Sequence, residues 1–151
     1  MQLSTATFLP ALLSALASAT LAAPLSMAAP AATEWTIQSL SRTCDEGDKT
    51  CQWEFGINTG EDRVAPVHVK YIVDATKAAP ASRAAGGPQT FGKFTVTSTW
   101  SGQFGEGLGF TTLSIVDYAK KLIVYPAYTD GQLASGAVVT PDQSYPVYRL
   151  P

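Results

Sequence analysis

The chain has 151 residues, and its ten Lys and Arg against twelve Asp and Glu give a formal charge of −2. The basic residues are scattered, with Lys120–Lys121 as the only adjacent pair, so the sequence has no basic stripe to neutralise a row of phosphates. Two cysteines and one histidine fall short of the roughly four ligands that a structural zinc site needs. Nucleic acid is therefore not an expected partner, and we expect no metal and no cofactor.

The N-terminal segment has the features of an export signal. Residues 1–33 carry no charged side chain, and they contain the apolar run FLPALLSALASATLAA, which ends in small residues. This pattern is typical of a secretory signal peptide, here with cleavage after Ala19 or Ala22. Pro and Ser residues interrupt the run, which argues against a membrane anchor of about 18 apolar residues. We expect a signal peptide at 1–22, a flexible Ala/Pro-rich leader at 23–33, a single domain at 34–151 and a secreted product.

Both cysteines lie in the stretch RTCDEGDKTCQWEF. From Cys51 to Asn58, apolar and polar side chains alternate, which indicates a strand and places Cys44 opposite Cys51 across a hairpin. Because an even number of cysteines in an exported chain favours a disulfide, we expect this pair to be oxidised, with a contribution of about 2.5 kcal/mol. A redox pair would be Cys-x-x-Cys, and a calcium loop would need carboxylates at other spacings. The acidic residues at 45–48 are interpreted as a solvated turn.

Further strands follow from the same alternation. Apolar side chains share one face around Trp35 and Ile37, along VHVKYIVD at 67–74 and along FTVTSTW at 94–100. Residues 75–90 are rich in Ala, Pro and Gly and show no period, so they predict a long loop.

The segment SGQFGEGLGF places four glycines among two phenylalanines. A phosphate cradle would require a strand that feeds a helix N-terminus, and this segment runs into another strand instead. We therefore expect a Gly-rich bend or bulge between two strands.

The C-terminal third predicts short strands. GFTTLSIVDYAKKLIVYPAYTD indicates a strand, a polar turn and a second strand at Leu122–Tyr125, which Pro126 ends. TDGQLASG predicts one helical turn closed by Gly136, and AVVTPDQSYPVYRLP predicts two strands broken at Pro141–Asp142. The sequence thus predicts an all-β, single-domain small β-barrel or β-sandwich of about seven to eight antiparallel strands with one disulfide.

Few residues carry catalytic chemistry. The sequence has no Gly-x-Ser-x-Gly motif, and a catalytic triad would depend wholly on His68, which lies on the outer face of its strand. Glycoside hydrolysis needs only two carboxylates, and Glu54 and Glu106 are the candidates, but nothing in the sequence pairs them. We therefore expect no catalytic residues and a protein that is not an enzyme.

Aromatic side chains are the candidates for a binding surface. Trp53 falls on the apolar face of its strand and is assigned to the core. The candidate surface-binding residues lie beside loops or at strand ends: Trp100, Phe104, Tyr125 and Tyr128. Exposed aromatic rings of this kind also suit stacking on cell-wall polysaccharide, which is the alternative function considered.

Five segments carry a resemblance to a known group of proteins. They are WTIQSLSRTC, C-x-W-x-F-G-I-N-T-G, WSGQFG, GFTTLSIVDYAKKLIVYPAYTD and PDQSYPV. Together they are similar to the small secreted fungal elicitors that provoke a hypersensitive response in plants, of the rice-blast-fungus type. The likeness covers most of the chain from Trp35 to the C-terminus.

This resemblance implies a compact β-fold that is exported during infection and sensed by plant cells as a trigger of defence or cell death. It assigns no catalytic residues, and it implies a second cysteine pair in some relatives that this chain lacks. The resulting hypothesis is a secreted effector that binds a plant surface or apoplastic receptor, with no nucleic-acid partner and no membrane span.

Overall fold

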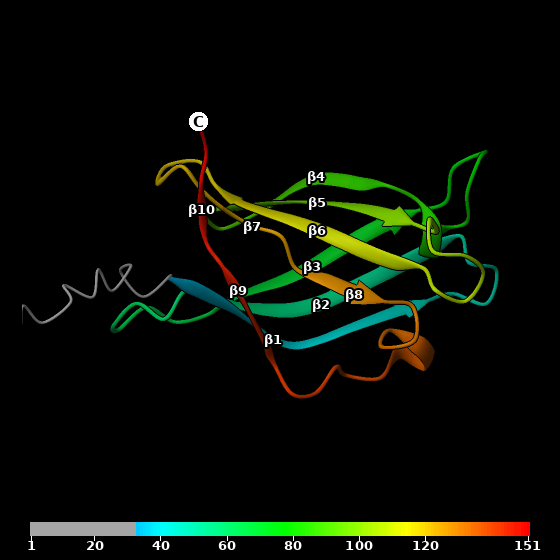
Figure 1. Ribbon diagram of the computed structural model, residues 1–151, viewed down its shortest axis with the longest axis horizontal. Helices are drawn as coiled ribbons and strands as arrows, with labels where there is room; N and C mark the ends of the chain where they lie inside the picture. Colours follow the sequence, from blue (N-terminus) through cyan, green and yellow to red (C-terminus); the bar gives the residue numbers. More distant parts are fainter. Residues whose placement is uncertain (1–32) are drawn as a thin grey trace, which may run out of the picture.

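Residues 33–151 are described by a computed structural model, and they form two antiparallel β-sheets that pack face to face (Figure 1). The predicted signal peptide, and the predicted leader except Thr33, lie outside the described residues. The strands are β1 (Glu34–Cys44), β2 (Thr50–Asn58), β3 (Val67–Asp74), β4 (Gly86–Phe91), β5 (Phe94–Ser101), β6 (Phe110–Asp117), β7 (Leu122–Val124), β8 (Ala127–Thr129), β9 (Gln143–Pro146) and β10 (Tyr148–Arg149). Two short 3₁₀ turns complete the elements, η1 (Ala81–Arg83) and η2 (Ala134–Gly136).

The strand order defines a β-sandwich. One sheet has four strands in the order β3-β2-β1-β9, and the other has six, in the order β10-β7-β6-β5-β4 with β8 also paired to β6. The all-β prediction and the single disulfide are confirmed, and the sheets do not close into a barrel. The described residues contain ten strands instead of seven or eight, because strands as short as β8 and β10 are set by their pairing partners and show too few residues to alternate.

The core lies between the two sheets, on the faces that alternation predicts. In β2 and β3 the buried side chains alternate, and the same holds for β5 up to Ser98 and for β6 up to Ile115. Trp35 of β1 meets Phe94 of β5 across the core, edge to face, with ring centroids 5.1 Å apart. Each fully buried large apolar side chain contributes about 1.5–3 kcal/mol, so this shared layer holds the sheets together.

Residues 75–90 are predicted as one long loop, and this prediction is wrong for the second half of the segment. It contains η1 and most of β4, which pairs with β5. The side chain of Gln89 explains why β4 lies where it does: its amide Oε1 accepts from the Ile72 N–H at 3.1 Å, and its Nε2 donates to the Ile72 carbonyl. Gln89 thereby covers the outer edge of β3 and joins the two sheets along one side. The sequence of β4 does not alternate, so no local pattern reveals this strand.

The C-terminal prediction is also corrected in part. No strand precedes Pro141 in 137–140, and both short strands, β9 and β10, follow it. The Val139 N–H donates one hydrogen bond to the Leu40 carbonyl at 2.7 Å. This bond fixes the segment 137–140 without forming a strand pair. The helical turn before it is confirmed as η2, with Gly136 at a positive φ of 67°.

The loops at one end of the sandwich gather into a single region. The β1–β2 hairpin, η1, the β5–β6 loop and η2 all lie at the right-hand end of Figure 1.

Between residues 33 and 151 the structure contains no helix long and apolar enough to span a membrane.

Candidate functional site

The β5–β6 loop, residues 102–109, is the Gly-rich bend that the sequence predicts. Its base is packed tightly, since a Cβ on Gly102 would lie 3.0 Å from Cζ3 of Trp100, and one on Gly109 would lie 2.7 Å from Cζ2 of the same ring. At its tip, Gly105 and Gly107 have positive φ angles of 107° and 76° and no neighbour within 4 Å. Glycine is therefore required at the base for close approach and at the tip for conformation.

The Trp100 ring packs against the base of this loop and supports it. It is half-buried, and its Nε1 donates to Oδ2 of Asp130 at 3.0 Å. The guanidinium of Arg83 lies 5.0 Å from the ring centroid and pairs with Glu106 in the loop at 3.3 Å. The sequence proposed Trp100 as a surface-binding residue, and the structure places it as a support for the loop.

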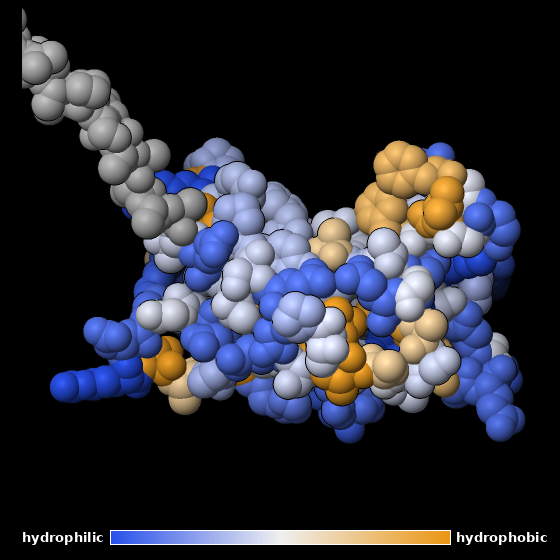
Figure 2. All heavy atoms as spheres, turned by 60° about the horizontal axis from the view of Figure 1, so that its bottom comes forward, coloured by the Kyte–Doolittle hydropathy of each residue, from blue (hydrophilic) through white to orange (hydrophobic). Residues whose placement is uncertain are grey.

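The exposed part of the loop is apolar. Phe104 and Leu108 are 64% and 61% exposed, and the Phe104 ring stacks on Phe110 with centroids 5.7 Å apart and planes at 30°. In Figure 2 a group of hydrophobic residues projects from the end of the molecule at which this loop lies in Figure 1. Phe104 is thus confirmed as an exposed aromatic residue.

A groove of about 820 Å³ runs between this loop and β8. Its lining consists of Phe104, Gly107, Leu108, Phe110, Ala127, Tyr128, Thr129 and Gly131. We call this surface the loop groove. Phe110 of β6 pairs with Thr129 of β8, so the groove floor is a piece of paired sheet, and the β5–β6 loop forms its other side.

Tyr128 does not present a free ring to this groove, which corrects the sequence prediction. It is 1% exposed, and its ring packs against Tyr145 of β9 with centroids 6.1 Å apart. Its hydroxyl is buried without a hydrogen-bond partner in the described part of the chain, and burial raises its pKa strongly. Tyr128 therefore belongs to the core and only borders the groove.

Tyr125 lies apart from the loop groove. It is 48% exposed in the connection between β7 and β8, and its ring centroid lies 6.0 Å from that of Tyr148 in β10. Tyr125 is thus confirmed as exposed. No pattern in the sequence singled out its neighbour Tyr148.

A buried cation lies close to the residues that support the loop. Arg42 of β1 is 8% exposed, donates to the Ser82 carbonyl at 3.2 Å and lies 5.4 Å from the Trp53 ring centroid. Its Nη1 is 3.8 Å from Oδ1 of Asp130, the residue whose other oxygen holds Trp100. Burial lowers the pKa of Arg42, and the nearby carboxylate of Asp130 opposes that shift. The sequence offered no signal for this cation, because alternation from Trp35 and Ile37 assigns Arg42 to the outer face, and a register shift between Gln38 and Ser41 turns it inward.

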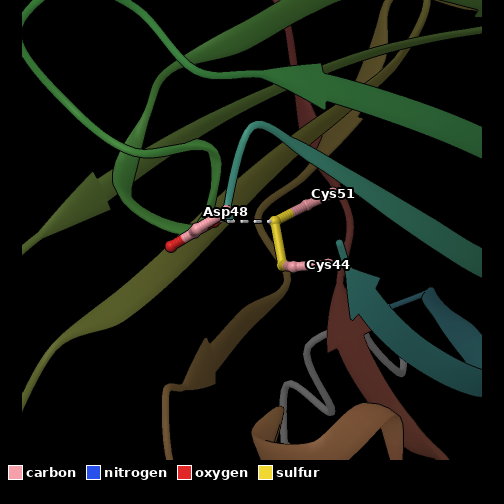
Figure 3. Close-up of side chains that lie close together, drawn as sticks. All are labelled: Cys44, Asp48 and Cys51. Atoms are coloured by element: carbon pink, nitrogen blue, oxygen red, sulfur yellow. Dashed lines mark hydrogen bonds between the residues drawn. A yellow bond between two sulfur atoms is a disulfide. The ribbon is translucent and has the colours of Figure 1, made fainter. Parts of the chain in front are cut away.

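The disulfide forms between the cysteines that the sequence paired. Cys44 and Cys51 are directly opposed in the β1–β2 ladder and are bonded to each other (Figure 3). Oδ1 of Asp48 lies 3.5 Å from the sulfur of Cys51, and because a disulfide sulfur carries no hydrogen we treat this as a packing contact. Oδ1 also accepts from the Ser82 N–H at 2.8 Å, which docks η1 onto the hairpin. Asp48 is therefore structural and half-buried, not simply solvated.

The cysteine pair and Asp48 do not form a metal site, although their ligand atoms lie within 4.8 Å of one another. Each sulfur is bonded to the other, and the carboxylate is already engaged by Ser82. A disulfide sulfur has no thiolate charge to offer a cation.

The residues considered for catalysis are not assembled into a site. His68 is an exposed residue of β3 paired with Gly56. Glu54 lies in β2 of the four-stranded sheet and accepts from Gln52 at 2.7 Å, whereas Glu106 belongs to the β5–β6 loop of the other sheet and pairs with Arg83. The two carboxylates thus have separate partners on separate sheets.

Comparison with known proteins identifies the family. A family model described as effector TSP1 matches residues 36–150. The chain belongs to the effector TSP1 family. A curated relative, effector TSP1 of Hypocrea virens strain Gv29-8, is 50% identical over 118 residues, which cover 78% of this chain and 78% of the relative. The chain is therefore a homologue of a fungal effector.

The match to the effector TSP1 family includes the whole loop groove. Sequence reasoning found Phe104 and missed Leu108 and Phe110, which complete the apolar surface. Both lie within the same Gly-rich segment, and the alternation of glycine with large apolar residues there was a usable signal.

Proposed function

We propose that this chain is a secreted fungal effector that acts by binding a plant surface or apoplastic receptor, with the loop groove as its contact face. One observation carries the proposal. Phe104 and Leu108 are exposed beside an apolar groove, at the tip of a loop whose base is packed against Trp100. Exposed apolar surface that a protein maintains at the cost of solvation is typical of an interaction site. Membership of an effector family and the resemblance to secreted elicitors support it.

The chemistry of the groove favours binding over catalysis. Among the described residues that line it, none carries a carboxylate, imidazole, amine or thiol. The only side-chain polar groups are the hydroxyls of Tyr128 and Thr129, and the first is buried. General acid–base or nucleophilic catalysis needs a titratable group within reach of the substrate, so this lining suits recognition.

The alternative of a cell-wall carbohydrate-binding protein is not favoured by the same geometry. Its aromatic platform rested in part on Trp100 and Tyr128, which are half-buried and buried. A stacking platform requires a ring face that the ligand can reach.

The experiment is infiltration of the purified mature protein into leaves over a range of doses. We expect necrosis, calcium influx or defence-gene induction at micromolar protein. The double variant Phe104→Ser/Leu108→Ser should need at least about tenfold more protein, since each lost apolar contact is worth about 1.5–3 kcal/mol and 1.4 kcal/mol is tenfold.

The matched control is Tyr118→Ser. Tyr118 is 65% exposed in the turn between β6 and β7, so this variant removes one large exposed side chain elsewhere on the molecule. It should act at the dose of the unaltered protein. Equal activity of the groove variant and this control would refute the groove as the contact face, and no response to any protein would refute the effector activity itself.

A further inference from the structure

A second aromatic site lies away from the loop groove. Tyr125, Tyr145, Pro146 and Tyr148 line a cleft of about 240 Å³, and none of them lines the loop groove. Tyr125 and Tyr148 are 48% and 52% exposed, and their ring planes meet at 46°. Because the rings are tilted and not stacked on each other, each one keeps a face toward the cleft or solvent.

The walls of this cleft are held in place from several elements. The Tyr145 hydroxyl has two acceptors within reach, the Ala127 carbonyl at 3.2 Å and Oε1 of Gln143 at 2.6 Å, and its single proton goes to one at a time. Tyr148 lies in β10 and pairs with Ile123 of β7. Directly after Tyr125, the carbonyl of Pro126 accepts from the Leu113 N–H at 2.7 Å. A ligand would therefore meet a preorganised surface, which lowers the entropic cost of binding.

The lining chemistry selects the ligand class. Three phenol rings and one pyrrolidine ring form the walls, and no charged side chain contributes to them. Since the Tyr145 hydroxyl is engaged, the hydroxyls of Tyr125 and Tyr148 are the side-chain polar groups left for a ligand. A saccharide presents many hydroxyl groups and needs a set of directed polar side chains, which this lining does not supply.

A polyproline II segment matches this lining. Its pyrrolidine rings present flat apolar faces to aromatic side chains, and its backbone carbonyls have no internal partners, so they accept from hydroxyl donors. Such segments also lose little entropy on binding, and aromatic-lined grooves are the usual sites that bind them. We propose that the cleft of Tyr125, Tyr145, Pro146 and Tyr148 binds a proline-rich segment of a partner protein in the polyproline II conformation.

The test is fluorescence anisotropy of a labelled decaproline peptide titrated with the whole mature protein. Saturable binding is expected, and Tyr125→Ala and Tyr148→Ala should each weaken it about tenfold through loss of a ring face. Tyr125→Phe and Tyr148→Phe keep the rings and remove one donor each, so they should weaken binding less, by about threefold. Both positions are half-exposed, and unchanged thermal melts would verify that the variants fold.

Three controls make the result specific. Tyr118→Ala changes an exposed tyrosine in another turn, and Phe104→Ala changes the loop groove, so neither should alter decaproline binding. A Gly/Ser decapeptide should not bind. No binding of decaproline at millimolar protein, or equal binding of the Gly/Ser peptide, would overturn the proposal. Binding of a chitin or β-glucan oligomer that is lost in the same two Ala variants, with no decaproline binding, would assign the cleft to saccharide instead.

Discussion

At the scale of single residues, the loop groove depends on side chains outside its lining. One carboxylate oxygen of Asp130 accepts a hydrogen bond from the Trp100 indole N–H, and the other lies near Arg42, so this carboxylate links Trp100 to the buried cation. Removing the counter-charge of a buried cation costs free energy, so these contacts favour one arrangement of Arg42, Asp130 and Trp100. The exposed side chains of Phe104 and Leu108 can then change their contacts, and the fold is retained.

The glycine at the loop base gives a prediction at this scale. Gly109→Ala should lower the free energy of unfolding by about 1–3 kcal/mol, because its Cβ would overlap the Asp130 carboxylate and the Trp100 ring. Gly131→Ala is the matched control, since its nearest neighbour is the Thr129 hydroxyl at 3.9 Å. Urea unfolding followed by tryptophan fluorescence measures both. Similar losses in the two variants would show that the loop base is not packed as described.

At the scale of elements, alternation predicts a strand only where both of its faces have a fixed environment. The β1–β2 hairpin, β3, β5 and β6 each have one face in the core and one in solvent, and all were predicted from the sequence. β4 has no buried face and is defined by pairing with β5 and by the Gln89 side chain. Such contacts between residues distant in the chain leave no local pattern.

The candidate site was predicted to a similar extent. The Gly-rich bend and Phe104 follow from local composition, since glycines with positive φ and large apolar residues in a loop are unusual together. Tyr128 was misplaced because β8 has three residues and lies directly after a proline, so its inner and outer faces cannot be distinguished by alternation. Arg42 and Asp130 are brought together only by the tertiary fold.

The hairpin disulfide gives a prediction for this element. The double variant Cys44→Ala/Cys51→Ala should fold and lose about 2.5 kcal/mol of unfolding free energy, because the crosslink limits the unfolded chain and not the core. Urea unfolding of the variant and of the reduced unaltered protein should agree. A variant as stable as the oxidised protein would mean that the hairpin is already fully constrained without the bond.

At the scale of the whole molecule, the two sheets are joined along both sides. Gln89 joins β4 to β3 on one side, and the chain itself crosses between the sheets from β9 to β10 on the other. The end that carries the loop groove is further fixed by Asp48, which binds Ser82 of η1. The fold thus provides a rigid frame from which one apolar loop projects.

Two buried tyrosines and the half-buried Tyr145 make the stability of this frame sensitive to alkaline pH. Burial raises the pKa of Tyr71, Tyr128 and Tyr145 above the usual value near 10.0. Above that pH the unfolded chain releases protons that the folded chain keeps. The contribution of these tyrosines to the free energy of unfolding is therefore complete below about pH 10. Above that pH the free energy of unfolding falls by about 1.4 kcal/mol per pH unit for each tyrosine that titrates only in the unfolded chain.

Tyr128→Phe isolates one of these contributions. Its hydroxyl has no hydrogen-bond partner among the described residues, so the variant should match or exceed the stability of the unaltered protein at pH 7. Between pH 10 and 11 its stability should fall less steeply. Urea unfolding across this range provides the measurement, and an unchanged slope would contradict the burial of this phenol in the folded state.

Competition for binding to plant cells tests whether the chain acts through its loop groove. Fluorescently labelled protein should bind leaf protoplasts or intact leaf cells saturably, and unlabelled protein and Tyr118→Ser should displace it at equal concentrations. We predict that Phe104→Ser/Leu108→Ser needs at least about tenfold more protein for the same displacement. Displacement by this groove variant at the concentration of the unaltered protein would contradict the claim that the chain acts through its loop groove.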